Sequence, residues 1–270
     1  MNGFFRDLED KGKVLVFGHR GFSQEYPENT MLSFSMCAGN PQIDGVELDV
    51  HMCRSGEIVV AHDFSLKRTA ALDCEIEDLT LDELRDIDVG SFKGPGFADA
   101  RIPLLSDLFA TFGSRFLYDI ELKVKAGHVN AAMSRKVIAL ISDFGLWPRI
   151  LVSSFNPFAL GAFRRACRHH RGAVVPPMAD IFARSPDIPK VLWNGAGHVV
   201  SRGSYLKPES KQVDDAFLRT HGRLPVITWT VNTEAEAVKL LELNRSSMRV
   251  FGMIGNDPHM LADVVSRYTR

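Results

Sequence analysis

Short apolar runs rich in β-branched residues alternate with longer amphipathic segments from one end of the chain to the other. This alternation is typical of repeated strand–helix units that build a parallel sheet. We therefore expect strands over residues 14–17, 45–50, 58–61, 116–123, 150–154, 172–175, 198–201, 224–229 and 250–254.

The amphipathic segments between these runs predict helices over residues 29–38, 129–143, 157–168, 213–221, 233–243 and from about 257 to 267. Two of these helices carry clear start signals. Asn156 stands before Pro157, and Asn232 or Thr233 stands before Glu236, so each helix begins with a capping side chain followed by a proline or an acid.

About eight strand–helix units in roughly 250 residues suit a closed (β/α)8 TIM barrel in a single domain over residues 1–270. An open doubly wound sheet is the alternative, although the chain has no glycine-rich dinucleotide loop. Residues 64–103 interrupt the alternation with acidic helix fragments around 79–87 and the loop GSFKGPGF. We interpret this segment as an insertion and not as a second domain.

Composition narrows the class of protein. The hydrophobic fraction of 45% is enough for a large core, and 32 basic against 33 acidic residues give no field that favours nucleic acid or an anionic membrane. The first residues lack the apolar core of a secretory signal, and no run reaches the ~20 apolar residues of a membrane span. Four scattered cysteines fit a reducing compartment. We expect a soluble cytoplasmic protein.

Paired charges recur within two of the predicted strands. Glu47 and Asp49 are two residues apart and project from one face, and Glu121 with Lys123 repeats the spacing in another strand. Carboxylates that share an interior face repel each other unless a proton or a cation lies between them, and three of them are the hard oxygen ligands that Mg²⁺ or Ca²⁺ prefers. The alternative is that they are solvated surface acids. Asp119 has the same parity but should lie deeper, so we leave it out of the metal site.

Histidines follow two of the predicted strands. His19 and Arg20 stand between two glycines directly after the first run, and His62 follows residues 58–61. Two histidines at separate strand ends, beside a metal site, can serve as general base and general acid. Arg20 and Lys123 suit an anionic phosphoryl substrate, or could just balance the carboxylates. We interpret His51 as a rim residue, and His169 with His170 as a solvated helix end.

The motifs GHRGFSQEYPENTMLSF, GVELDVHMCRSGEIVVAHD, IELK, SSF and TWTVN resemble, in order and spacing, those of the glycerophosphodiester phosphodiesterases. The resemblance runs from about residue 14 to residue 260. It implies a TIM barrel with a small insertion after the second barrel strand, which would be residues 64–103. Residues 58–61 would then form a companion strand outside the eight.

The resemblance also implies roles for single residues. His19 and His62 would be the acid–base pair, Glu47, Asp49 and Glu121 would bind one divalent cation, and Arg20 and Lys123 would contact the phosphate. Phe155 and Trp229 resemble aromatic residues of the glycerol-side pocket, or are ordinary barrel packing. Glu28 and Asn29 would hold the first loop and cap the following helix.

The implied reaction is hydrolysis of a small glycerophosphodiester to sn-glycerol 3-phosphate and an alcohol. A lysophospholipase D-type hydrolase on the same site and a non-catalytic barrel that binds phosphoryl ligands are the alternatives. Gly255-Asn256-Asp257-Pro258 departs from the Thr-Asp-x-Pro motif of the family, and RGSYLKPES matches no motif of the family. The choice of Mg²⁺ or Ca²⁺, the histidine roles, water against a cyclic-phosphate route, the head group and the oligomeric state stay open.

Overall fold

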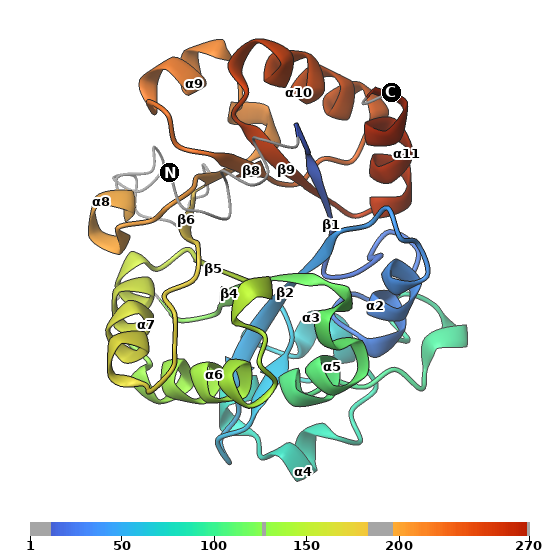
Figure 1. Cartoon of the computed structure of the whole chain (residues 1–270). Coiled ribbons are helices and arrows are strands. Elements are labelled where there is room, and N and C mark those ends of the chain that lie inside the picture. The colour runs from blue at the N-terminus through green and yellow to red at the C-terminus, as the bar shows by residue number, and fades with distance from the viewer. Residues whose placement is uncertain (1–11, 126–127, 183–196, 269–270) are drawn as a thin grey trace.

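Eight parallel strands form a nearly closed barrel that is surrounded by helices (Figure 1). The computed structural model describes residues 12–125, 128–182 and 197–268. The strands are β1 (Leu15–His19), β2 (Gly45–Met52), β3 (Ile58–Val60), β4 (Leu117–Leu122), β5 (Ile150–Ser154), β6 (Met178–Phe182), β7 (Lys207–Pro208), β8 (Val226–Thr228) and β9 (Val250–Gly255). The main helices are α2 (Met31–Ala38), α5 (Leu105–Phe112), α6 (Ala131–Asp143), α7 (Pro157–His169), α8 (Gly197–Ser201), α9 (Asp215–Thr220), α10 (Glu234–Ser247) and α11 (Pro258–Tyr268).

The strands pair in the order β7-β6-β5-β4-β2-β1-β9-β8, and every pair in this ring is parallel. Parallel bridges between Leu206 and Val226 and between Glu209 and Trp229 join β7 to β8 at the remaining seam. The barrel is therefore the predicted fold class. Strand β3 pairs antiparallel with β2 outside the ring, which confirms that residues 58–61 form a companion strand.

Apolar side chains fill both faces of the strands, because side chains alternate between the barrel interior and the helices. Val46, Leu48 and Val50 of β2 belong to the large core between strands and helices. A second cluster inside the barrel includes Phe17 and Leu117. Gly45 makes room for it, because a Cβ there would lie 2.4 Å from the Leu117 carbonyl oxygen and 2.6 Å from the Phe17 ring.

Helices α7 and α10 begin where their capping residues predict. Asn156 accepts hydrogen bonds from the amides of the first turn of α7, and Thr233 accepts one in α10. Helix α2 is capped by Thr30, whose side chain forms a capping box with Ser33, so the prediction of Asn29 as the cap is wrong. Helix α5 was not among the predicted helices. None of the helices in the described part of the chain has the length and the apolar run needed to cross a bilayer.

Two predicted strands are wrong, both in the second half of the barrel. Residues 172–175 form no strand, because Val174 is 60% exposed and two prolines follow, and β6 starts only at Met178. Residues 198–201 lie in helix α8, where Val199 is 80% exposed, and the seventh barrel strand is Lys207–Pro208. The β-branched valines here face solvent, so their strand propensity did not decide the structure.

Residues 64–103 contain only short helices, α3 (Lys67–Ala70), η1 (Ile76–Asp78), α4 (Leu81–Leu84) and η2 (Pro95–Phe97). The segment and its neighbours form a small apolar cluster of their own around Leu66, Ile76 and Leu84. Lys93 donates a hydrogen bond of 2.8 Å to the carbonyl of Ser23, which ties the segment to the loop after β1. That the segment is an insertion stays a prediction.

Candidate active site

The end of β1 forms the tight turn that the two glycines predict. A Cβ at Gly18 would lie 2.7 Å from the Cys37 sulfur, and Arg20 and Gly21 have φ of 57° and 82°. The turn directs His19 to Asn256, since Nδ1 of His19 is 2.7 Å from Oδ1 of Asn256. Burial first, and then the Arg20 charge, lower the pKa of His19 to about 3.

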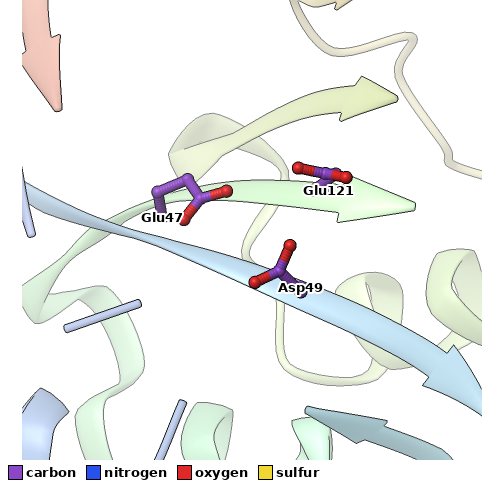
Figure 2. Close-up of side chains that lie close together, drawn as sticks. All are labelled: Glu47, Asp49 and Glu121. Carbon is purple, nitrogen blue, oxygen red and sulfur yellow. The ribbon is translucent and has the colours of Figure 1, made fainter. Parts of the chain in front are cut away.

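Three buried carboxylates meet above the apolar interior of the barrel. In the β2–β4 register Glu47 is opposite Asp119, and Asp49 is opposite Glu121. Ligand oxygens of Glu47, Asp49 and Glu121 all lie within 4.8 Å of one another. Figure 2 shows the side chains of the two neighbouring strands directed toward a common space. The structure thus brings the three predicted metal ligands together.

The carboxylates carry the electrostatic signs of a cation site. Burial and the neighbouring Asp49 raise the pKa of Glu47 to about 8. Burial acts in the same direction on Asp49, but Lys123, His62 and Arg20 hold the pKa of this carboxyl well below its usual value. Asp49 Oδ1 has no hydrogen-bond partner within the described ranges. Crowded buried carboxylates are a donor set that suits a divalent cation.

Two cations flank these acids. Lys123 Nζ lies 2.7 Å from Glu121 Oε1 and 3.3 Å from Asp49 Oδ1. Arg20 Nε lies 3.4 Å from Asp49 Oδ2, while its Nη1 donates to Glu28 at 3.0 Å. Both side chains are therefore within the site, although each already contacts a carboxylate.

The first loop supports the site through Asn29. Its Nδ2 donates to Asp49 Oδ2 at 2.8 Å, and its Oδ1 accepts from the Asp49 amide at 3.4 Å. Asn29 is 3% exposed and has a φ of 55°, in the left-handed region that asparagine tolerates best among residues with a Cβ. Its role is to hold a predicted metal ligand and not to cap a helix.

His62 lies directly beyond β3 and faces the site from the companion strand. Its Nδ1 is 2.6 Å from Asp63 Oδ1, and its carbonyl lies 3.4 Å from His51 Nε2. His51 belongs to β2 and is fully buried, with Nδ1 4.0 Å from a Glu77 carboxylate oxygen. Strand β2 continues two residues beyond its predicted end, and His51 follows Val50, the last residue of β2 that pairs with β4. The interpretation of His51 as a rim residue stays a prediction.

A single pocket gathers most of the predicted site residues. It is lined by His19, Arg20, Glu47, His62, Glu121, Phe155, Ile181, Lys207, Trp229 and Ile254. The rings of Phe155 and Trp229 form one wall, with centroids 5.7 Å apart at 81°. Lys123 Nζ lies 5.9 Å from the Phe155 centroid, so the aromatic wall also borders the cations.

Lys207 is the pocket residue that the sequence did not indicate. Its ammonium lies 2.9 Å from Asp119 Oδ2, 2.9 Å from Ser153 Oγ and 3.7 Å from Glu47 Oε1, and the side chain is 2% exposed. Asp119 is thereby paired below the three clustered acids. A strand of two residues shows no alternation of inward and outward side chains. The only sequence feature that could have indicated Lys207 is the stretch RGSYLKPES in which it stands.

Comparisons with known proteins show the family to which the chain is similar. The model of the glycerophosphoryl diester phosphodiesterase family matches residues 19–259. A glycerophosphodiester phosphodiesterase of Bacillus altitudinis is 35% identical over 231 residues, which are 84% of this chain and 90% of that protein.

Solved structures show the same fold. An Oleispira antarctica phosphodiesterase in complex with the product sn-glycerol-3-phosphate superposes with a TM-score of 0.74 at 24% identity, covering 96% of this chain and 99% of that one. A glycerophosphodiester phosphodiesterase from Agrobacterium tumefaciens gives a TM-score of 0.72 at 20% identity, covering 93% and 99%.

Proposed function

This chain belongs to the glycerophosphoryl diester phosphodiesterase family, and we propose that it hydrolyses glycerophosphodiesters to sn-glycerol 3-phosphate and an alcohol. The observation that carries the proposal is the meeting of two histidines and an acidic cluster in one pocket. His19 and His62 line it from separate strands, and Glu47 and Glu121 line it beside them. This set can take a proton from the attacking oxygen and give one to the leaving oxygen at the phosphorus of a phosphodiester.

In this proposal Glu47, Asp49 and Glu121 hold one divalent cation, Mg²⁺ or Ca²⁺. The fit rests on the donor set, since all three ligands are buried carboxylates whose oxygens lie within 4.8 Å of one another. The bound cation would polarise the phosphoryl oxygens and neutralise developing charge. Arg20 and Lys123 lie beside these acids and would contact the remaining phosphate oxygens.

The hydrogen bonds of the two histidines suggest different roles. An amide oxygen only accepts, so Nδ1 of His19 donates to Asn256 and Nε2 has the lone pair in the neutral ring. Nδ1 of His62 donates to the Asp63 carboxylate, so this histidine has a charged partner where His19 has a neutral one. We assign His19 as the base that takes the proton of the attacking hydroxyl or water. His62 is the acid that protonates the leaving alkoxide as its P–O bond breaks.

Phe155 and Trp229 form the apolar wall of the pocket, and we assign them to the carbon chain of the glycerol. Trp229 also lies beside the base, with its ring centroid 6.4 Å from that of His19. An aromatic face excludes water from one side of a small alcohol while leaving its hydroxyls free to hydrogen-bond. Replacement of either ring by alanine should therefore raise KM for glycerol esters more than it lowers kcat.

The test measures the release of glycerol 3-phosphate from glycerophosphocholine. The protein is first freed of metal with a chelator, and Mg²⁺ or Ca²⁺ is then added back. Activity should depend on the cation, and His19→Ala and Glu47→Ala should each lose at least about 100-fold in kcat. His169→Ala, at an exposed histidine of α7, is the matched control and should keep full activity. Full activity of His19→Ala or of the cation-free protein would contradict the mechanism. Turnover of lysolipids alone would favour the lysophospholipase D alternative.

A second substrate separates the acid from the base. The 4-nitrophenyl ester of glycerol 3-phosphate has a leaving group that departs without protonation. His62→Ala should therefore lose far less activity with this ester than with glycerophosphocholine, whereas His19→Ala should lose a similar factor with both. The opposite pattern would exchange the two roles.

A further inference from the structure

Arg68 of helix α3 lies between two loops of the site. Its Nε donates to Asp63 Oδ2 at 2.7 Å, and its two terminal nitrogens donate to the carboxylate of Glu28 at 3.0 and 2.6 Å. Its Cζ is 5.7 Å from the centroid of the Phe92 ring, which comes from the same 64–103 segment. Three nitrogens and one face of the guanidinium are thus engaged. Such a fork has little freedom to reorient.

Each of the two carboxylates also contacts a residue of the pocket. Asp63 Oδ1 is 2.6 Å from His62 Nδ1, and Glu28 Oε1 accepts from Arg20 at 3.0 Å. Partial burial opposes the ionised form of Asp63, but hydrogen bonds from His62 and Arg68 lower the pKa of this carboxyl. The carboxylate is therefore shared between the histidine and the arginine.

We propose that Arg68 is a positioning residue for the acid step, and this rests on the proposed role of His62. The Asp63 side chain is 29% exposed and follows the strand β3, so nothing in its burial fixes its rotamer. Arg68 holds Oδ2 while Oδ1 accepts from His62, which keeps Nε2 of the imidazole directed into the pocket. Glu28 is the anchor that keeps the guanidinium in place.

A role in holding the fold does not explain these contacts. Arg68 is 44% exposed, and ion pairs of exposed side chains contribute little to stability. The guanidinium nevertheless contacts Asp63, which is the hydrogen-bond partner of a pocket histidine. Loss of a residue that supports a metal-bound histidine in this way typically lowers metal affinity or activity by about 10- to 100-fold. Stability and activity should therefore separate in variants at this position.

The experiment compares Arg68→Gln with Arg85→Gln, a matched change in the same segment where the arginine is 62% exposed and pairs only with Asp82 in the described structure. With glycerophosphocholine, Arg68→Gln should lose about 10-fold in kcat with little change in KM. With the 4-nitrophenyl ester it should lose less than about 2-fold, because this leaving group needs no acid. Arg68→Lys, which keeps the charge without the fork, should recover part of the loss.

The same change is then made in the His62→Ala background. If Arg68 acts through this histidine, Arg68→Gln should cause no further loss there. Equal losses with the two substrates, or a full additional loss without His62, would overturn the positioning role. If the wild-type protein hydrolyses neither substrate, the proposed function is wrong. If it hydrolyses both and Arg68→Gln behaves as Arg85→Gln, only the positioning role of Arg68 is wrong.

Discussion

Lys207 should be essential to the stability of the barrel interior, and Lys207→Met tests this. Its ammonium is 2.9 Å from Asp119 Oδ2 and 3.7 Å from Glu47 Oε1, and burial acts to lower its pKa while these acids raise it. Methionine keeps the length of the chain but leaves the Asp119 charge without its partner. Removal of one member of a buried ion pair typically costs about 3–5 kcal/mol, so the free energy of unfolding should fall by this amount.

Urea unfolding followed by circular dichroism measures the loss, with Lys211→Met as the exposed control expected to change stability by less than about 0.5 kcal/mol. Adding Asp119→Asn to Lys207→Met removes the unpaired charge and should restore at least half of the lost stability. If the double variant is no more stable than Lys207→Met alone, the cost does not come from the uncompensated carboxylate, and the electrostatic explanation is wrong.

Three further predictions follow from the site and its surroundings. A saturating divalent cation should raise the melting temperature, because a ligand at 100 times its Kd adds about 2.7 kcal/mol, and calorimetry should show this gain lost in Glu121→Gln. Gly45→Ala should destabilise the barrel by roughly 1–3 kcal/mol in denaturant unfolding, since the added Cβ meets backbone and the Phe17 ring. Burial raises the pKa of Asp180 from 3.8 to about 6, so the folded state holds a proton that the unfolded state loses first. Stability should therefore fall as pH rises from about 4 to about 6, and Asp180→Asn should remove this pH dependence; an unchanged profile would show that the carboxyl is not the source.

Alternation along a strand explains which site residues the sequence could indicate. Glu47 and Asp49 lie in an eight-residue strand, and Glu121 in one of six, so their shared face could be read from spacing alone. The same reading placed Asp119 below the cluster, where the structure pairs it with Lys207. Strand β7 has only two residues and includes a proline, so no periodicity could place Lys207 inside the barrel.

Contacts between segments that are far apart in the chain could not be predicted from the sequence, for a different reason. Asn256 meets His19 across 237 positions, and Asn29 meets Asp49 through a left-handed turn. These partnerships depend on how β9 and the first loop fold back beside β1 and β2, and local propensity carries no information on that. The departure of residues 255–258 from the family motif thus gave no indication that Asn256 lies beside the histidine.

The charge of the site explains why these partnerships matter together. Four carboxylates on the barrel strands face three cations, so acids outnumber bases when all are ionised, and the residues are Glu47, Asp49, Asp119, Glu121, Arg20, Lys123 and Lys207. Burial and the neighbouring acids together raise the pKa of Glu47 to about 8. In the proposed function a divalent cation would add two positive charges, which favours binding of a phosphodiester monoanion. Because Lys207 balances Asp119, the three remaining acids are left for the proposed cation.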